Sequence, residues 1–357
     1  MPPFSPSPRG LRMPAEWEPH EATWLAWPHE RTDWPGKFAP IPWVFAEITW
    51  WLARSEKVCI LVDDSRMETR ARRVLARRGV DLGNVQFFHV ATDRSWLRDS
   101  GPTFVVRDDG ARREVAALDW SFNAWARYGN WQRDSRVAAA VAHCAGVPIT
   151  QPIAAETGRR MVLEGGSIDV NGQGLLLTTE ECLLSTVQQR NPGLSREGIE
   201  QVFAQYLGVE ETIWLKRGIA GDDTHGHVDD LARFVAPDKV VIVTEPDPDD
   251  INHEPLAENL ALLRAHRLRS GRPLEVVELP MPRAITCDGV RLPASYANFY
   301  IANSVVLVPT FNDPRDREAL NTLAALFPDR TVTGIHCTDL VWGLGTIHCS
   351  TQQQPAA

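Results

Sequence analysis

Short apolar runs recur along the chain and alternate with longer segments in which apolar residues have helical spacing. The short runs predict buried strands at 58–62, 85–90, 174–177, 240–244, 275–279 and 305–308. The longer segments predict helices at 42–53, 66–78, 133–144, 195–207, 255–269 and 315–326. This alternation is typical of an α/β protein, and no linker rich in Pro, Gly and Ser divides the chain.

A repeated pattern of polar and apolar positions is more informative. Four stretches begin with a polar residue, continue as an apolar strand, turn, and in most cases return as a second apolar strand. They begin at Asp99, Glu164, Asp229 and Asn298, which lie 65, 65 and 69 positions apart, and a shorter fifth copy spans 345–354. The repeat predicts a propeller-like ring of ββαβ modules. Each module would place its polar residue at a common axis, a natural ligand site.

Cys349, in the fifth copy, is the first candidate for chemistry. Gly343 and Gly345 precede it, and residues 347–349 are predicted to form a strand, on which alternation would turn His348 away from the face of Cys349. A cysteine attacks only as the thiolate, so a nucleophilic role needs a cationic neighbour that lowers the pKa of the thiol. The alternative is a buried, inert thiol.

The segment 222–230, DDTHGHVDD, is dense in histidines and acids. His225, His227 and Asp229 have the same parity on a strand, so we expect them to face one cavity. In one interpretation His227 is a general acid and base, and Asp229 binds a cation. In a second, these three residues bind a metal ion. A third leaves the segment as a solvated acidic loop.

Two further acids begin the earlier copies of the repeat. Asp99 precedes a Gly-Pro turn in WLRDSGP, and Glu164 stands in LEGG, whose paired glycines allow a backbone or a ligand to come close. Alone, either acid could be a turn residue. Brought together with Asp229, they would repel one another unless a cation binds. A planar guanidinium meets this need, because a carboxylate can accept two of its N–H donors side by side.

The composition narrows the function further. The 357 residues are 43% hydrophobic and 23% charged, which is ordinary for a globular protein, and the net charge of −9 argues against binding to nucleic acid or to anionic membranes. No apolar run is long enough to span a bilayer. We expect residues 1–12, rich in Pro and Ser, to be a disordered leader, and residues 13–355 to form a single catalytic domain.

The six cysteines are scattered and form no CxxC pair. This usage indicates reduced thiols, a cytoplasmic protein and no structural zinc. Cys59 and Cys144 read as core residues, and Cys337 is a weaker rival of Cys349 as the nucleophile.

The longest motifs are MPAEWEPHEATWLAWP, SWLRDSGPTF, DWSFNAW, LEGGSIDVNGQG, DTHGHVDD, ASYANFYIAN and GTIHCSTQQQP. With them the chain resembles, over nearly its whole length, the agmatine deiminases, which are grouped with the bacterial-type peptidylarginine deiminases in the guanidino-group-modifying (pentein) superfamily. The resemblance implies a pentein propeller of five ββαβ modules with pseudo-fivefold symmetry.

Matched motif by motif, the resemblance also implies roles for single residues. Cys349 is the implied nucleophile, and His227 the implied general acid and base. Asp99 and Asp229 are expected to grip the guanidinium nitrogens of a small cationic substrate. Glu164 is expected to lie beside His227 and the substrate.

The implied reaction is the hydrolysis of agmatine to N-carbamoylputrescine and ammonia, a step from arginine towards polyamines, through an amidino-thioether on Cys349. The resemblance implies neither a metal nor another cofactor. We expect Trp96 to line the substrate site. Asp223, where many members of the family carry glutamate, is expected to contact the substrate and to affect recognition of its amine tail.

Other functions stay open at this point. The substrate could be arginine or a C-terminal peptidyl-arginine, if Arg98 or Arg127 pairs with the α-carboxylate. The site could instead transfer the amidino group to an amine, use a metal held by His225, His227 and Asp229, or bind guanidino compounds without catalysis. His225 and Asp230 stand where many members of the family carry asparagine. The sequence does not predict the oligomeric state, and a homodimer or a homotetramer is possible.

Overall fold

The hairpins predicted from the repeat are present in the computed structural model, which describes residues 10–108, 110 and 112–357. Each consists of two antiparallel strands. They are β5 (Thr103–Asp108) with β6 (Arg113–Leu118), β10 (Asp169–Val170) with β11 (Leu175–Thr179), β13 (Ala232–Ala236) with β14 (Lys239–Thr244), and β18 (Tyr300–Ile301) with β19 (Val305–Thr310).

After each hairpin a helix crosses over, and a third strand returns parallel to the second. The crossover helices and their strands are α4 (Val137–Ala145) with β7 (Ile149–Thr150), α6 (Arg196–Leu207) with β12 (Glu211–Leu215), α7 (His253–Ala265) with β15 (Glu275–Pro280), and α8 (Asp316–Leu326) with β20 (Thr331–His336). The middle strands, such as β14, are buried on both faces. This explains why they read as continuous apolar runs.

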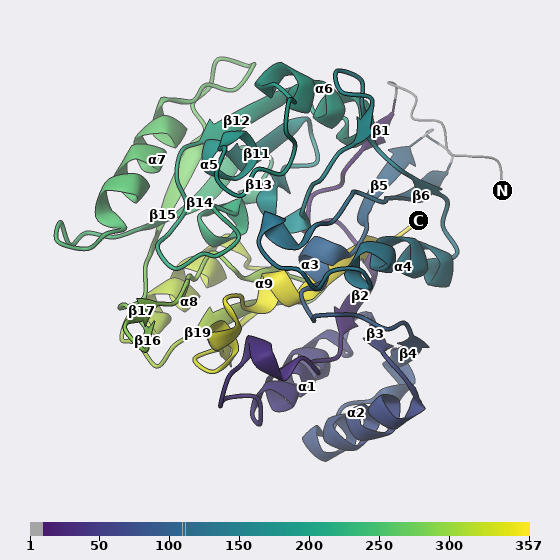
Figure 1. The fold of residues 1–357 in the computed structure, drawn as a ribbon. Helices are drawn as coiled ribbons and strands as arrows, with labels where there is room; N and C mark the ends of the chain where they lie inside the picture. The colour runs from purple at the N-terminus through teal and green to yellow at the C-terminus, as the bar shows by residue number, and fades with distance from the viewer. Residues whose placement is uncertain (1–9, 109, 111) are drawn as a thin grey trace.

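Both ends of the described chain build one further sheet. β21 (Thr351–Pro355) pairs antiparallel with β2 (His20–Ala26), and Figure 1 shows the yellow C-terminal segment beside this early strand. The chain continues through α1 (Ile41–Leu52), β3 (Lys57–Val62), α2 (Ser65–Arg78) and β4 (Val85–His89), with β3 and β4 parallel to β2. Among the described residues, five sheets thus share the order antiparallel pair, crossover helix and parallel strand, and in four of them the pair is a hairpin. The predicted α/β class is confirmed.

Short elements complete the structure and supply most of the polar centre. The remaining helices and strands are α3 (Leu97–Ser100), α5 (Glu180–Leu184), α9 (Ile347–Ser350), β1 (Leu11–Arg12), β8 (Ile153–Ala154), β9 (Arg159–Arg160), β16 (Thr286–Cys287) and β17 (Val290–Arg291). The 3-10 turns are η1 (Arg31–Asp33), η2 (Leu82–Asn84), η3 (Ala124–Ala126), η4 (Asp134–Arg136), η5 (Gly165–Ser167), η6 (Val228–Asp230) and η7 (Leu340–Gly343). In Figure 1 the long helices lie around the outside, with α3 and α9 near the centre, in contact with each other.

Most predicted elements agree with the structure to within a few residues. Asp64 caps the N-terminus of α2, where its side chain accepts from the N–H of Met67 (2.7 Å), and Gly79, with φ 84°, caps the C-terminus. The helix predicted at 255–269 ends earlier, because His266 has extended backbone angles. The predicted leader lies, over residues 1–9, outside the described residues, whereas Leu11 and Arg12 already pair with β5.

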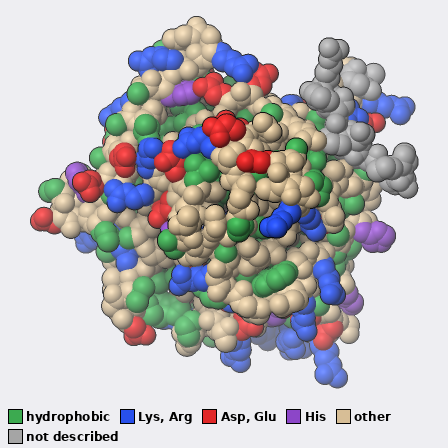
Figure 2. All heavy atoms as spheres, turned by 45° about the horizontal axis from the view of Figure 1, so that its top comes forward, with side chains coloured by type: hydrophobic (Ala, Val, Ile, Leu, Met, Phe, Trp, Pro, Cys, Tyr) green, Lys and Arg blue, Asp and Glu red, His purple; other side chains and the backbone are tan. Residues whose placement is uncertain are grey.

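The surface gives little sign of an apolar partner. Figure 2 shows charged side chains of both signs spread over one face, with apolar side chains in small groups. Within the described ranges, no helix is long and apolar enough to cross a bilayer.

Candidate active site

A cavity of about 300 Å³ opens beside α3 and α9. Its lining comes from segments far apart in the sequence and includes Asp33, Trp96, Asp99, Trp125, Asp223 and Cys349. This volume suits a small ligand.

Cys349 lies on α9, a single helical turn, so the prediction of a strand at 347–349 was wrong. The cause is Asn298, whose Oδ1 accepts hydrogen bonds from Thr346 Oγ1 (2.7 Å) and from the backbone N–H of His348 (3.1 Å). A side-chain amide thus provides the partner that a neighbouring strand would have given to this N–H. Asn298 Nδ2 also donates to Cys349 Sγ (3.1 Å) and fixes the thiol.

The thiol of Cys349 is surrounded by acids. Burial raises its pKa well above the usual value, and the charges of Asp229, Asp230 and Asp99 raise it further. Its Sγ lies 3.7 Å from Oδ2 of Asp229. In this environment the sulfur stays protonated, and a cation close to it is needed to form the thiolate.

His227 lies between two of the predicted acids. Its Nδ1 is 3.8 Å from Oδ2 of Asp99, and its Nε2 is 3.8 Å from Oε2 of Glu164. Burial lowers the pKa of His227, but Asp99, Cys182 and Glu164 outweigh burial, so the pKa is raised well above the usual value. The imidazole is therefore charged at neutral pH and can give up a proton.

Asp99 is one of two acids in the cavity lining, with Asp33, whose pKa burial raises to about 6. Its Oδ2 accepts from Trp125 Nε1 (2.8 Å), and its Oδ1 accepts from the backbone N–H of Gly166 (3.0 Å). Burial raises its pKa to about 6, an effect that the charge of His227 only partly offsets, while Asp229 and Glu164 add to it.

The other two acids have fixed cationic partners. Arg190 Nε donates to Oε1 of Glu164 (3.1 Å), and this guanidinium with His227 lowers the pKa of Glu164 to about 2, although burial opposes the change. Asp229 Oδ2 lies 2.7 Å from Nδ1 of His348, which outweighs burial and lowers the pKa of Asp229. Oδ1 of Asp229 has no hydrogen-bond partner within the described part of the chain.

Gly166 is the point where these side chains meet. A Cβ atom on Gly166 would lie 2.6 Å from His227 Nδ1, 3.0 Å from Asp99 Oδ1 and 3.1 Å from Asp229 Oδ2. The second glycine of the LEGG motif therefore allows the close approach that the sequence suggested.

Aromatic and acidic residues form the wall and the mouth. Trp96 lines the cavity, as expected, and donates from Nε1 to Oδ2 of Asp33 (3.2 Å). Asp223 accepts a hydrogen bond from the Tyr128 hydroxyl and lies 3.8 Å from Nε of Arg127. Burial raises the pKa of Asp223.

Several expectations about neighbouring residues were wrong. His225 does not face this cavity, because its φ of 68° turns the chain, and its Nε2 lies 3.1 Å from Ser185 Oγ in a separate surface pocket. His348 is not turned away from the site, since it shares an oxygen of Asp229 with the thiol. Arg98 is buried and donates to Gln353 Oε1 (2.7 Å), so it is not placed to bind a substrate carboxylate.

The metal site formed by His225, His227 and Asp229 is not assembled. A different trio, Glu164, Cys182 and His227, has candidate ligand atoms within 4.8 Å of one another. Glu164 already holds the guanidinium of Arg190, which would repel a metal cation. The donor set therefore fits a metal poorly.

Sequence reasoning missed three residues that shape the site. Trp125 lies in the motif DWSFNAW. No pattern in the sequence predicts the left-handed backbone angles of Ala124–Ala126 (φ 50° to 59°), which direct its indole towards Asp99. Arg190 and Cys182 contact the site only through the tertiary fold, so local patterns could not reveal them.

A thiol and carboxylates that line a cavity, with a buried imidazole beside them in an α/β fold, are typical of enzymes that use a cysteine nucleophile. The chain belongs to the family of Porphyromonas-type peptidyl-arginine deiminases, whose family model matches residues 12–355. The resemblance found in the motifs is thereby confirmed.

Individual relatives cover nearly the whole chain. An agmatine deiminase of Pseudomonas aeruginosa (strain LESB58) is 39% identical over 99% of this chain and 98% of its own length. The solved agmatine deiminase of Enterococcus faecalis superimposes with a TM-score of 0.89 at 34% identity, covering 99% of this chain and 98% of that one. An agmatine deiminase of C. jejuni with substrate bound has a TM-score of 0.84 at 28% identity, covering 96% of each chain.

We predict that Gly166→Ala lowers the free energy of unfolding by about 1–3 kcal/mol, because the added methyl overlaps three packed side chains. Gly129→Ala is the matched control, since a Cβ at Gly129 meets nothing within 4 Å. It should change stability by no more than about 0.5 kcal/mol. Urea denaturation measures both, and equal values would contradict the crowding at Gly166.

Proposed function

We propose that this protein is an agmatine deiminase that converts agmatine and water to N-carbamoylputrescine and ammonia. The observation that carries the proposal is that Cys349 and Asp99 line one cavity, while Asp229 lies 3.7 Å from the thiol and His227 lies 3.8 Å from Asp99. Relatives named agmatine deiminase, similar over the full chain, support it.

The carboxylates of Asp99 and Asp229 bind the guanidinium. A planar cation between them can donate to Oδ1 of Asp229, for which the described residues provide no other hydrogen-bond partner. At an effective dielectric constant of ~20 and a separation of ~4 Å, each charge contact is worth on the order of 4 kcal/mol before desolvation. The bound cation also offsets the acids that keep Cys349 protonated, so the thiol loses its proton to solvent.

The thiolate attacks the guanidinium carbon and forms a carbon–sulfur bond. His227, already protonated, gives its proton to one nitrogen, the carbon–nitrogen bond breaks and ammonia leaves. The amidino-thioether on Cys349 remains. Neutral His227 takes a proton from water as the water attacks the same carbon. The carbon–sulfur bond then breaks, the remaining hydroxyl proton passes to solvent, and the ureido product and the Cys349 thiolate are formed. Glu164, held by Arg190, keeps the imidazole in place.

The mouth of the cavity favours an amine tail over a carboxylate. Asp33 and Asp223 line it together with Arg94, and Arg94 pairs with Asp33, so Asp223 is the acid that can meet a primary ammonium. Arg127 is half exposed and lies near Asp223, so neither it nor Arg94 presents an unpaired guanidinium to an α-carboxylate. Agmatine, which lacks that carboxylate, therefore fits better than arginine.

The proposal extends to the whole chain. The five sheets of common connectivity would form a pentein propeller with pseudo-fivefold symmetry, and residues 13–355 would act as one catalytic domain. The six free cysteines suit a cytoplasmic enzyme. The partner is a small guanidino cation, and the acidic net charge of −9 argues against nucleic acid.

We predict that the wild-type protein forms ureido product from agmatine in preference to arginine or a peptide with C-terminal arginine. Cys349→Ala should lower turnover by about 10³-fold or more, because no other group replaces the nucleophile. Cys144→Ala, at a half-buried position on α4, is the control and should stay within about twofold. Turnover of the wild type, Cys349→Ala and Cys144→Ala is measured by ammonia release. Normal release by Cys349→Ala would show that this thiol is not the nucleophile.

Binding of agmatine should depend on pH through Asp99. Its pKa is about 6, and only the ionised form attracts a cation, so affinity is full above this pKa and is lost as the pH falls through it. In the Cys349→Ala background, the Kd for agmatine measured by calorimetry should rise about tenfold per pH unit below pH 6. Asp99→Asn in the same background should bind more weakly and depend less steeply on pH, the remaining dependence coming from Asp33, whose pKa burial also raises to about 6. The same pH dependence in both variants would contradict the role of Asp99.

Recognition of the amine tail should depend on Asp223. We expect Asp223→Asn to raise KM for agmatine roughly 5- to 50-fold, with a smaller change in kcat, because a charged hydrogen bond to the ammonium weakens. Butylguanidine, which has no amine, serves as the control substrate, and its kcat/KM should hardly change. Equal losses with both substrates would show that Asp223 acts on the guanidinium end or on the fold.

A further inference from the structure

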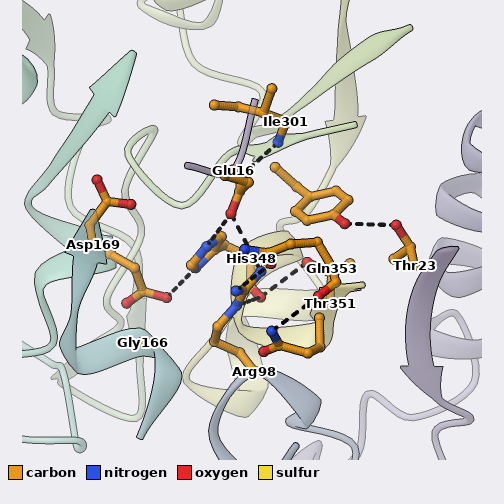
Figure 3. Close-up of polar contacts among 12 residues, drawn as sticks. Glu16, Thr23, Arg98, Gly166, Asp169, Ile301, His348, Thr351 and Gln353 are labelled. Carbon is orange, nitrogen blue, oxygen red and sulfur yellow. Dashed lines mark hydrogen bonds and ion pairs between the residues drawn. The ribbon is translucent and has the colours of Figure 1, made fainter. Parts of the chain in front are cut away.

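His348 lies between two carboxylates in the interior of the protein, and Figure 3 shows its ring with Glu16, Arg98 and Gln353 close by. Its Nδ1 is 2.7 Å from Oδ2 of Asp229, and its Nε2 is 2.8 Å from Oε2 of Glu16. All three side chains are buried. The imidazole thus joins an acid of the active site to an acid deeper in the protein.

Both contacts have hydrogen-bond length, but an ionised carboxylate can only accept. A neutral imidazole carries one N–H and can satisfy one acceptor. Burial would raise the pKa of Glu16, yet Arg233, His348 and Arg98 hold it well below its usual range. The pKa of Asp229 is lowered as well, although burial alone would raise it. Glu16 has the guanidinium groups of Arg233 and Arg98 beside it. Asp229 lies at hydrogen-bond distance from the other ring nitrogen, so this geometry calls for a donor on each nitrogen of His348.

Surrounding groups hold Glu16 in place. Its Oε2 lies 2.9 Å from a terminal nitrogen of Arg233 and 3.5 Å from one of Arg98, and its Oε1 accepts from the backbone N–H of Ile301 (2.8 Å). Arg98 also donates from Nε to the carbonyl of His348 (3.3 Å), which anchors the backbone that carries the ring. The geometry is therefore fixed from both sides before substrate arrives.

We propose that His348 is a positioning residue whose two ring nitrogens donate hydrogen bonds to Asp229 and to Glu16. It occupies Oδ2 of Asp229 and leaves Oδ1 as the oxygen that receives the guanidinium, so this inference rests on the proposed deiminase function. The same Oδ2 lies 3.7 Å from Cys349 Sγ, so the imidazolium also weakens the repulsion between this acid and the thiolate.

The role follows from the crowding of acids. Asp229 and Asp99 lie near each other, since a Cβ on Gly166 would touch both. Two such carboxylates without separate cations tend to share a proton, and a protonated acid would not grip a cation. The imidazolium keeps Asp229 ionised, whereas Asp99 has only the more distant charge of His227.

The first test is the charge of the ring. The ¹⁵N NMR spectrum of wild-type protein labelled in its histidine rings should show both nitrogens of His348 protonated between pH 7 and 8, with the signals assigned by their loss in His348→Asn. Glu16→Gln, which keeps the shape of the acid, should shift these signals towards a neutral ring. A neutral ring in the wild type would overturn the inference, even if the protein turns over agmatine.

The second test separates positioning from folding. His348→Asn can still donate a hydrogen bond to Asp229 but carries no charge, so KM for agmatine should rise on the order of 10- to 100-fold, with a smaller loss of kcat. His89→Asn is the control, because His89 also contacts a glutamate (Glu68, 2.7 Å) but lies on the surface. It should stay within about twofold. Unchanged KM in a folded His348→Asn would overturn the positioning role.

If His348→Asn does not fold, Glu16→Gln replaces it in both tests. The histidine ring signals that shift in Glu16→Gln are then assigned to His348 and report its charge. KM for agmatine should also rise in Glu16→Gln. Should the wild type release no ammonia from agmatine, the proposed function fails. The nitrogens of His348 then still decide whether the imidazolium exists.

Discussion

The structure depends on the need to balance buried carboxylates with cations. Glu164 has the guanidinium of Arg190, and Asp229 has the ring of His348. Asp99 has only the imidazole of His227 at 3.8 Å, and its pKa is accordingly raised to about 6. The acids that face Cys349 are therefore the least well compensated of the cluster, and their charges raise the pKa of the thiol. A pocket with this imbalance selects a cation, and the cation in turn makes the thiol nucleophilic.

The fold brings these groups together through short turns rather than through long elements. Asp99 lies on α3, Asp229 on η6 and Cys349 on α9, and Glu164 directly precedes η5. Each of these turns leads into the first strand of a sheet with the same connectivity. The long helices lie outside and can vary without moving the side chains at the centre. The residues of the active site therefore lie on short turns, whose structure local sequence patterns predict least well.

This division explains how much could be predicted. Strands and helices follow from apolar periodicity, which is local, so hairpins such as β13–β14 were predicted and the polar residue before each was identified. Residues 347–349 were mispredicted because a distant amide, that of Asn298, stabilises a turn there. The shared parity assumed for His225 and His227 failed because two positive φ angles, at His225 and Gly226, interrupt the backbone between them. Glu16 could not be linked to the site at all, since its contact with His348 exists only in the folded chain.

The pairing of β2 with β21 has a consequence for synthesis. The ribosome makes β2 first and β21 much later, so at about 5–20 residues per second roughly 15–65 s pass before the two strands can meet. Cys349 emerges just ahead of β21. The active site therefore lacks both the thiol of Cys349 and the ring of His348, the partner of Asp229, until synthesis reaches β21.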